Sequence, residues 1–143
     1  MNKTRNNELV KLADEALNNT NRILFKEPTG NGIDIFDAYN GQIAALSVTI
    51  AMSGLRPALA IYYQDAKTKV KRRNILTIIA KMIQTDIHRD LENANDNNFR
   101  DERSLFQYAL ATTDNGLKKL TKEVEECAIA LKQVVRTYNL VKS

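Results

Sequence analysis

Cysteine and histidine are almost absent from the 143-residue sequence, which contains one of each, Cys127 and His88. A single cysteine cannot form an internal disulfide, and this favours a reducing compartment, so we expect a cytoplasmic protein. One cysteine and one histidine also cannot assemble a zinc site of the His/Cys type. We therefore expect no metal and no other cofactor.

Motifs of the common enzyme classes are absent as well. The sequence has no G-x-x-x-x-G-K-[ST], no G-x-G-x-x-G and no G-x-S-x-G. The stretch "HRDLENAN" (88–95) matches a kinase catalytic loop, but it lacks the glycine-rich loop, strand lysine and D-F-G that kinase chemistry requires. The apolar runs are much shorter than a membrane span. We expect a non-enzymatic protein with no membrane partner.

Only two prolines and five glycines interrupt the chain, and apolar residues recur with helical spacing almost throughout. The sequence predicts an all-α fold, a compact bundle of about six helices that forms a single helical domain over residues 1–143. The predicted helices cover 4–24, 34–53, a short stretch with Pro57 near its start, 65–91, 104–111 and 117–141, and the third and fourth could be continuous. Loops are predicted at 26–32 and 92–102, and a break at Asn115-Gly116.

The last predicted helix carries an apolar stripe with the 3-4 spacing of a coiled coil. Its members are Leu117, Leu120, Val124, Cys127, Leu131, Val134, Tyr138 and Val141. The flanking positions hold neutral residues such as Thr121, Ala128 and Val135, so the stripe is too wide for a lone zipper. We favour packing inside the bundle. The alternative is self-association through the stripe, in a helical protein-interaction bundle with no nucleic-acid role.

Positive charge is concentrated in one segment. Residues 67–89 carry seven basic side chains and one acidic one, whereas the rest of the chain is nearly balanced. Five of these cations fall within seven positions: Lys67, Lys69, Lys71, Arg72 and Arg73. At the start of a helix they would oppose the helix dipole and repel one another. Electrostatic repulsion that no nearby acidic residues offset is typical of a binding site. A cluster of positive charges would attract a polyanion.

We expect these cations to project from the packed body and to contact the phosphate backbone of RNA without reading its bases. Five such contacts with a single strand would lower log K by roughly 3.5 per decade of salt concentration. A solubilising role is the simplest alternative. Another is a helix-turn-helix DNA-binding regulator, but "YYQDAKTK" lacks the glycine of the tight turn that this motif uses.

The stretch "AYNGQIAALSVTIAMSGLRPALAIYYQ" (38–64) resembles the small subunit of the Cmr (type III-B) CRISPR effector complex. A helix rich in small residues ends at Gly54-Leu55, and a short alanine-rich helix with an aromatic end follows. The lysine-rich segment before an apolar helix and the long final helix are also similar in placement.

This resemblance implies a non-catalytic subunit that works in antiviral defence. Copies of it would stack along the effector filament beside the repeated backbone subunit and the large subunit, and would hold guide or target RNA by its phosphates. The family's basic surface corresponds here to the five cations, with Arg56 as a further candidate.

Overall fold

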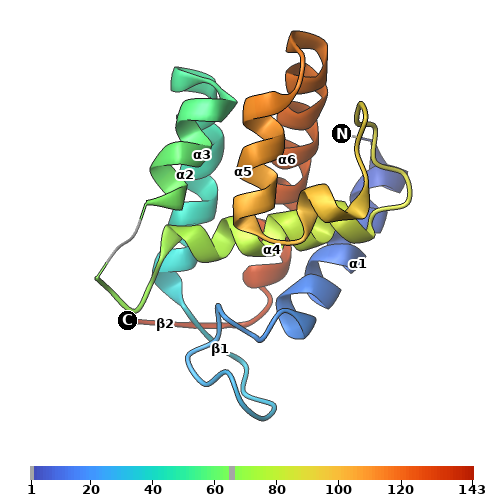
Figure 1. Cartoon of the computed structure of the whole chain (residues 1–143). Coiled ribbons are helices and arrows are strands. Elements are labelled where there is room, and N and C mark those ends of the chain that lie inside the picture. Colours follow the sequence, from blue (N-terminus) through green and yellow to red (C-terminus); the bar gives the residue numbers. More distant parts are fainter. Residues whose placement is uncertain (1, 65–66) are drawn as a thin grey trace.

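The computed structural model describes residues 2–64 and 67–143. These residues form six α-helices, one 3₁₀-helix and two short strands, which confirms the predicted all-α fold (Figure 1). The elements are α1 (Lys3–Asn19), β1 (Asp34–Phe36), α2 (Asp37–Ser53), α3 (Leu55–Tyr63), α4 (Arg72–Thr85), η1 (Asp96–Phe99), α5 (Glu102–Ala111), α6 (Asp114–Val135) and β2 (Asn139–Val141). In the described part of the chain, no helix is both long enough and apolar enough to span a bilayer.

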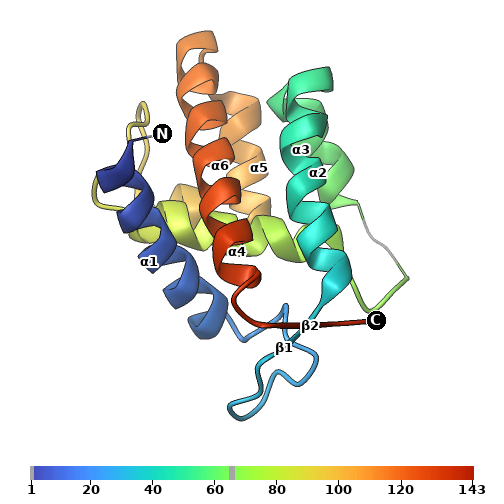
Figure 2. The same ribbon diagram turned by 180° about the vertical axis from the view of Figure 1, so that it is seen from behind.

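Helix α4 lies across the other five helices and contacts each of them (Figure 1). It can do so because apolar residues occupy most of its circumference. Its buried residues are Ile75, Leu76, Ile78, Ile79, Ala80, Met82 and Ile83. On the opposite side, α6 packs between α1 and α2 (Figure 2). The apolar stripe of the last helix is buried here from Leu120 to Val134, which confirms the prediction that it packs inside the bundle.

The ends of three helices differ from the prediction. Helix α1 ends at Asn19 rather than at residue 24, because Asn21 (φ 55°) and Arg22 (φ 49°) adopt the left-handed conformation that terminates a helix. Helix α4 ends at Thr85 rather than at Leu91. The predicted break at Asn115-Gly116 is wrong, because the Thr113 side chain accepts a hydrogen bond from the Gly116 main chain (3.0 Å) and caps α6 one turn earlier.

A small parallel sheet replaces the predicted start of α2 and the predicted C-terminal part of the last helix. Strands β1 and β2 pair with Ile35 opposite Leu140, so α2 begins at Asp37 rather than at Asp34. For the same reason the last helix ends at Val135 instead of Val141. Ile35 is fully buried and also bridges Phe25 on the other edge of β1. This pairing joins residues about 100 positions apart, which helical periodicity cannot reveal.

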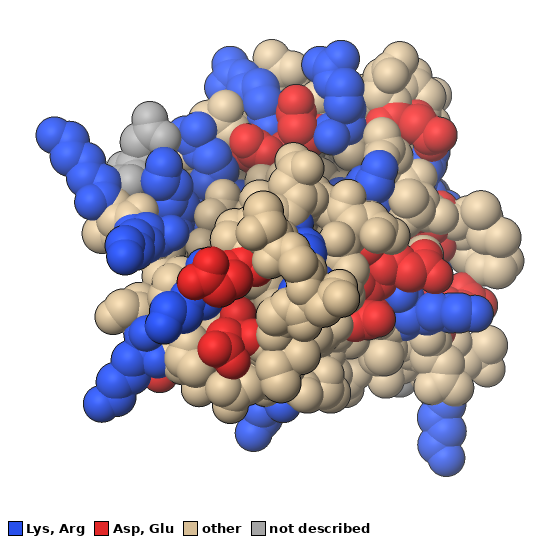
Figure 3. Space-filling view, turned by 90° about the horizontal axis from the view of Figure 1, so that it is seen from below, with Lys and Arg blue, Asp and Glu red and all other residues tan. Residues whose placement is uncertain are grey.

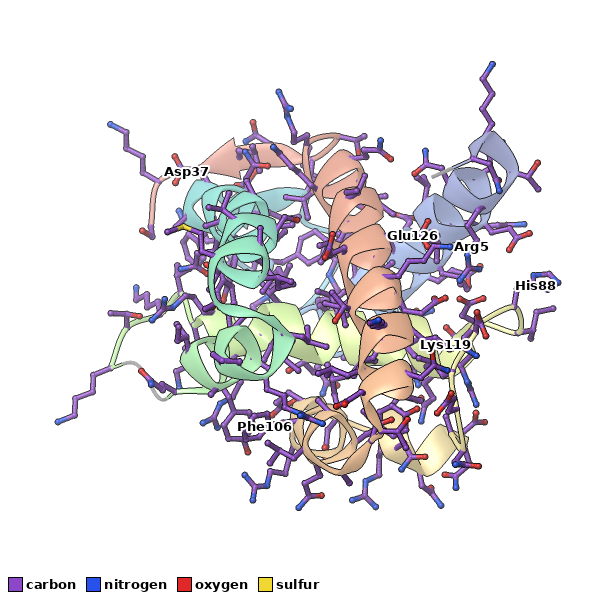
Figure 4. The ribbon with its side chains drawn as sticks, turned by 90° about the horizontal axis from the view of Figure 1, so that it is seen from above. Arg5, Asp37, His88, Phe106, Lys119 and Glu126 are labelled. Atoms are coloured by element: carbon purple, nitrogen blue, oxygen red, sulfur yellow. The ribbon has the colours of Figure 1, made fainter. Side chains whose placement is uncertain are left out.

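A buried ion cluster joins α1, α4 and α6. Arg5 of α1 donates hydrogen bonds to both carboxylate oxygens of Asp86, at the end of α4, and to Oε2 of Glu123 in α6 (2.9 Å). Figure 4 shows Arg5 reaching from α1 towards α6. Burial raises the pKa of the Glu123 carboxyl, whereas the hydrogen bond with Asp86 raises the pKa of Arg5. The guanidinium is therefore the charge that keeps two buried carboxylates compatible with the fold.

Replacement of Arg5 by Met should lower the free energy of unfolding by about 3–5 kcal/mol at pH 7, because two buried carboxylates lose their cation. Protonation relieves this cost, since a carboxyl whose pKa is raised in the folded state stabilises the fold below that pKa. The deficit should therefore shrink as the pH falls from 7 towards 5. Denaturant unfolding followed by circular dichroism measures both effects.

The matched control is Lys11→Met, which removes an exposed cation from the same helix. It should change stability by less than about 0.5 kcal/mol at either pH. Equal stabilities of Arg5→Met and Lys11→Met would show that the cluster does not stabilise the fold.

Candidate nucleic-acid interface

The lysine-rich segment 67–73 connects α3 to α4. Its first three lysines precede α4, and only Arg72 and Arg73 lie in the first turn of that helix. The expectation that all five cations occupy the start of a helix is therefore wrong, and the predicted cap at Asp65 lies outside the described residues. Val70, which lies two residues before α4, is only 9% exposed and belongs to the buried core.

Four cations of this segment are exposed: Lys67, Lys69, Lys71 and Arg72. None of them forms an ion pair with a carboxylate in the described parts of the chain. Lys and Arg side chains accordingly crowd one edge of the lower face of the molecule (Figure 3). The N-terminus of α4 adds the positive end of its dipole, and no acidic side chain in the first turn offsets it. This edge is the candidate interface for a polyanion.

Two of the predicted ligands point inward instead. Arg73 donates from Nε (2.9 Å) and Nη2 (2.6 Å) to the main-chain oxygen of Tyr63, and its guanidinium lies 4.2 Å from the centre of the Tyr63 ring. Arg56 donates to the main-chain oxygens of Ala109 (2.7 Å) and Thr112 (2.9 Å), at the C-terminus of α5. Both guanidinium groups hold helix ends together, and their role as RNA ligands stays a prediction.

Of the two tyrosines before the segment, Tyr62 is buried in the core and Tyr63 is half-buried against it. Tyr62 is buried, donates its hydroxyl proton to the Gln42 main-chain oxygen (2.6 Å), and has its pKa raised by burial. Tyr63 stacks on Phe106 with 5.7 Å between ring centres. Both rings therefore serve intramolecular contacts, in agreement with an interface that recognises backbone rather than bases.

A family model described as CRISPR-associated protein (Cas_Cmr5) matches residues 11–138, about nine-tenths of the chain. The chain belongs to the Cas_Cmr5 family. This confirms the resemblance to the Cmr small subunit and makes the protein a CRISPR-associated subunit of a type III effector. Membership implies association with other subunits of the effector complex. No curated protein and no solved structure gives a significant match.

One group of possible metal ligands occurs in the described part of this Cas_Cmr5 protein. It comprises Glu8, Asp86 and His88, whose ligand atoms all lie within 4.8 Å of one another. Asp86 already accepts two hydrogen bonds from Arg5, and Glu8 lies within 2.9 Å of His88 Nδ1. Arg5 Nη1 also lies 3.4 Å from Glu8 Oε2, so this one guanidinium already pairs with both carboxylates that a metal would need.

Two basic residues of the same face were missed by the sequence analysis. Lys26 and Lys142 line a hollow together with Lys69. Each is an isolated lysine in the sequence, so neither belongs to a charge run. Only the pairing of β1 with β2 could have revealed their proximity.

The inward orientation of Arg73 predicts that Arg73→Lys destabilises this Cas_Cmr5 protein. Lysine cannot reproduce the two hydrogen bonds that converge on the Tyr63 main-chain oxygen together with the stacked guanidinium. We expect a loss of about 1–3 kcal/mol in the free energy of unfolding. The control Arg72→Lys, at the exposed neighbouring position, should change it by less than about 0.5 kcal/mol. Thermal and urea unfolding would measure both variants, and equal values would contradict the structural role of Arg73.

Proposed function

We propose that this protein is the non-catalytic small subunit of a type III-B CRISPR effector complex. In this proposal it acts in the cytoplasm, in antiviral defence, and holds guide or target RNA by the phosphates without sequence specificity. The observation that carries the proposal is the group of four exposed cations without described carboxylate partners, in a member of the Cas_Cmr5 family.

The chemistry of these side chains supports sequence-independent binding. A lysine ammonium is a point charge on a flexible stem, so it can follow phosphates without requiring a fixed geometry. Three of the four exposed cations are lysines in a non-helical segment, with Arg72 next to them at the start of α4. Unpaired cations release counterions from RNA without first breaking an internal ion pair, which favours binding.

The outer face of α2 supports packing against other subunits of the effector. No Asp, Glu, Lys or Arg occurs from Ala38 to Leu55. Val48 is 58% exposed and Met52 is 84% exposed on this helix, which lies at the surface (Figure 2). An uncharged, exposed helix face suits the neighbours of a filament, namely further copies of this chain, the repeated backbone subunit or the large subunit.

The structure gives less support to the other two functions. A helix-turn-helix motif joins its helices by a turn of three or four residues, whereas residues 64–71 separate α3 from α4. Its recognition helix would also lack the three lysines, which precede α4. A protein-interaction bundle would need the stripe of the last helix at the surface, but that stripe is buried from Leu120 to Val134.

The triple variant Lys67→Glu, Lys71→Glu, Arg72→Glu tests the proposal. It should weaken binding of a 20-nucleotide single-stranded RNA at least tenfold at 0.1 M salt, because three contacts with phosphate become repulsive. Fluorescence anisotropy measures the affinity. The fold should persist, since all three positions are exposed and a carboxylate in the first turn of α4 would complement the helix dipole.

The control reverses three exposed lysines elsewhere, Lys3 and Lys11 on α1 and Lys118 on α6. Both variants change the net charge by the same amount. A larger loss of RNA affinity in the first variant would therefore depend on the position of the charges and not on total charge. Equal RNA affinities of the two variants would contradict the proposal and would indicate that the cations of segment 67–73 only make the protein more soluble.

A further inference from the structure

The lower face of the molecule contains a hollow of about 560 Å³ whose rim carries three lysines. Lys26 follows the bridge at Phe25, Lys69 belongs to the exposed segment before α4, and Lys142 follows β2. The remaining lining residues are Ile23, Phe25, Glu27, Pro28, Phe36 and Ser143. Cations from three distant parts of the sequence therefore surround one cavity.

The small sheet brings these parts together. The Lys26 main-chain nitrogen donates to the oxygen of Asp34 (2.9 Å), which places Lys26 along one edge of β1. On the other edge, Val141 pairs with Phe36, so that Lys142 follows directly beyond the sheet. Both views of the ribbon show the C-terminal residues beside the segment that precedes α4 (Figures 1 and 2). The fold, rather than local sequence, creates the cluster.

The hollow is both positively charged and partly apolar. Glu27 is the single acidic side chain that lines it, against three lysines. All three lysines are exposed, and none forms an ion pair with a described residue. Phe36 is half-buried and contributes an aromatic ring to the wall. Cations beside an accessible aromatic ring are the combination with which proteins bind single-stranded nucleic acid.

We propose that this hollow binds one nucleotide of single-stranded RNA, with its phosphate between Lys26, Lys69 and Lys142 and its base against Phe36. This inference rests on the proposed function and extends it. Lys69 belongs both to the hollow and to the exposed edge formed by Lys67, Lys71 and Arg72, so the two surfaces form one continuous basic track. An RNA strand can follow such a track over several phosphates. An acidic segment of another protein is the competing ligand, and the experiment distinguishes the two.

The test compares Lys26→Gln/Lys142→Gln with wild type in binding a fluorescent 20-nucleotide uridine RNA. The loss of two phosphate contacts should weaken binding roughly 25-fold at 0.1 M salt. The control Lys11→Gln/Lys118→Gln removes the same charge from exposed positions on α1 and α6 and should weaken binding less than about threefold. Phe36→Leu keeps an apolar side chain against the core and should weaken binding about fivefold or more through lost stacking.

Four outcomes would overturn the inference. If both double variants lose affinity equally, net charge alone explains binding. If Lys26→Gln/Lys142→Gln binds like wild type while the Lys67/Lys71/Arg72 reversal does not, the hollow is excluded and the proposed function stands. If wild type shows no binding at millimolar protein, both proposals fail. If the variant keeps RNA affinity but no longer co-purifies with the other effector subunits, an acidic protein segment occupies the hollow.

Discussion

The position of α4 is the constraint on which the rest of the structure depends, and it is fixed at both ends by arginines. At its C-terminus, Asp86 is 2% exposed and is held by Arg5 of α1. At its N-terminus, Arg73 binds the Tyr63 main chain at the end of α3. The described residues that lead into α4 carry the exposed side chains of Lys67, Lys69 and Lys71.

The arginines and lysines of this region lie in different environments. Arg73 and Arg56 satisfy main-chain oxygens at helix ends, where a planar guanidinium forms two hydrogen bonds at once. Lys67, Lys69 and Lys71 stay solvated, and their charge is available to a partner. The five cations that are close together in the sequence therefore occupy different environments, and the proposed RNA track continues instead through Lys26 and Lys142.

Sequence patterns predicted correctly those features that depend on residues close together in the chain, such as a glycine at a helix end or an apolar repeat. Gly54 (φ 85°) ends α2 as expected, and the short helix around "SLFQYALA" and the burial of Cys127 are confirmed. Contacts between distant residues were not predictable in this way. Arg5 and Asp86 are 81 positions apart, and β1 pairs with β2 across about 100 residues. The spacing of apolar residues along the sequence gives no signal for either contact. The early end of the last helix and the three-lysine hollow therefore became apparent only in the structure.

The salt dependence of RNA affinity tests the central claim, that solvated cations bind phosphate, most directly. Binding of wild-type protein to single-stranded RNA would be measured between 50 and 300 mM salt. Four cations predict a slope of log K against log salt near −2.8, and Lys26 and Lys142 bring it to roughly −4.2. A slope shallower than about −1 would contradict the account, because no such set of phosphate contacts could then be present.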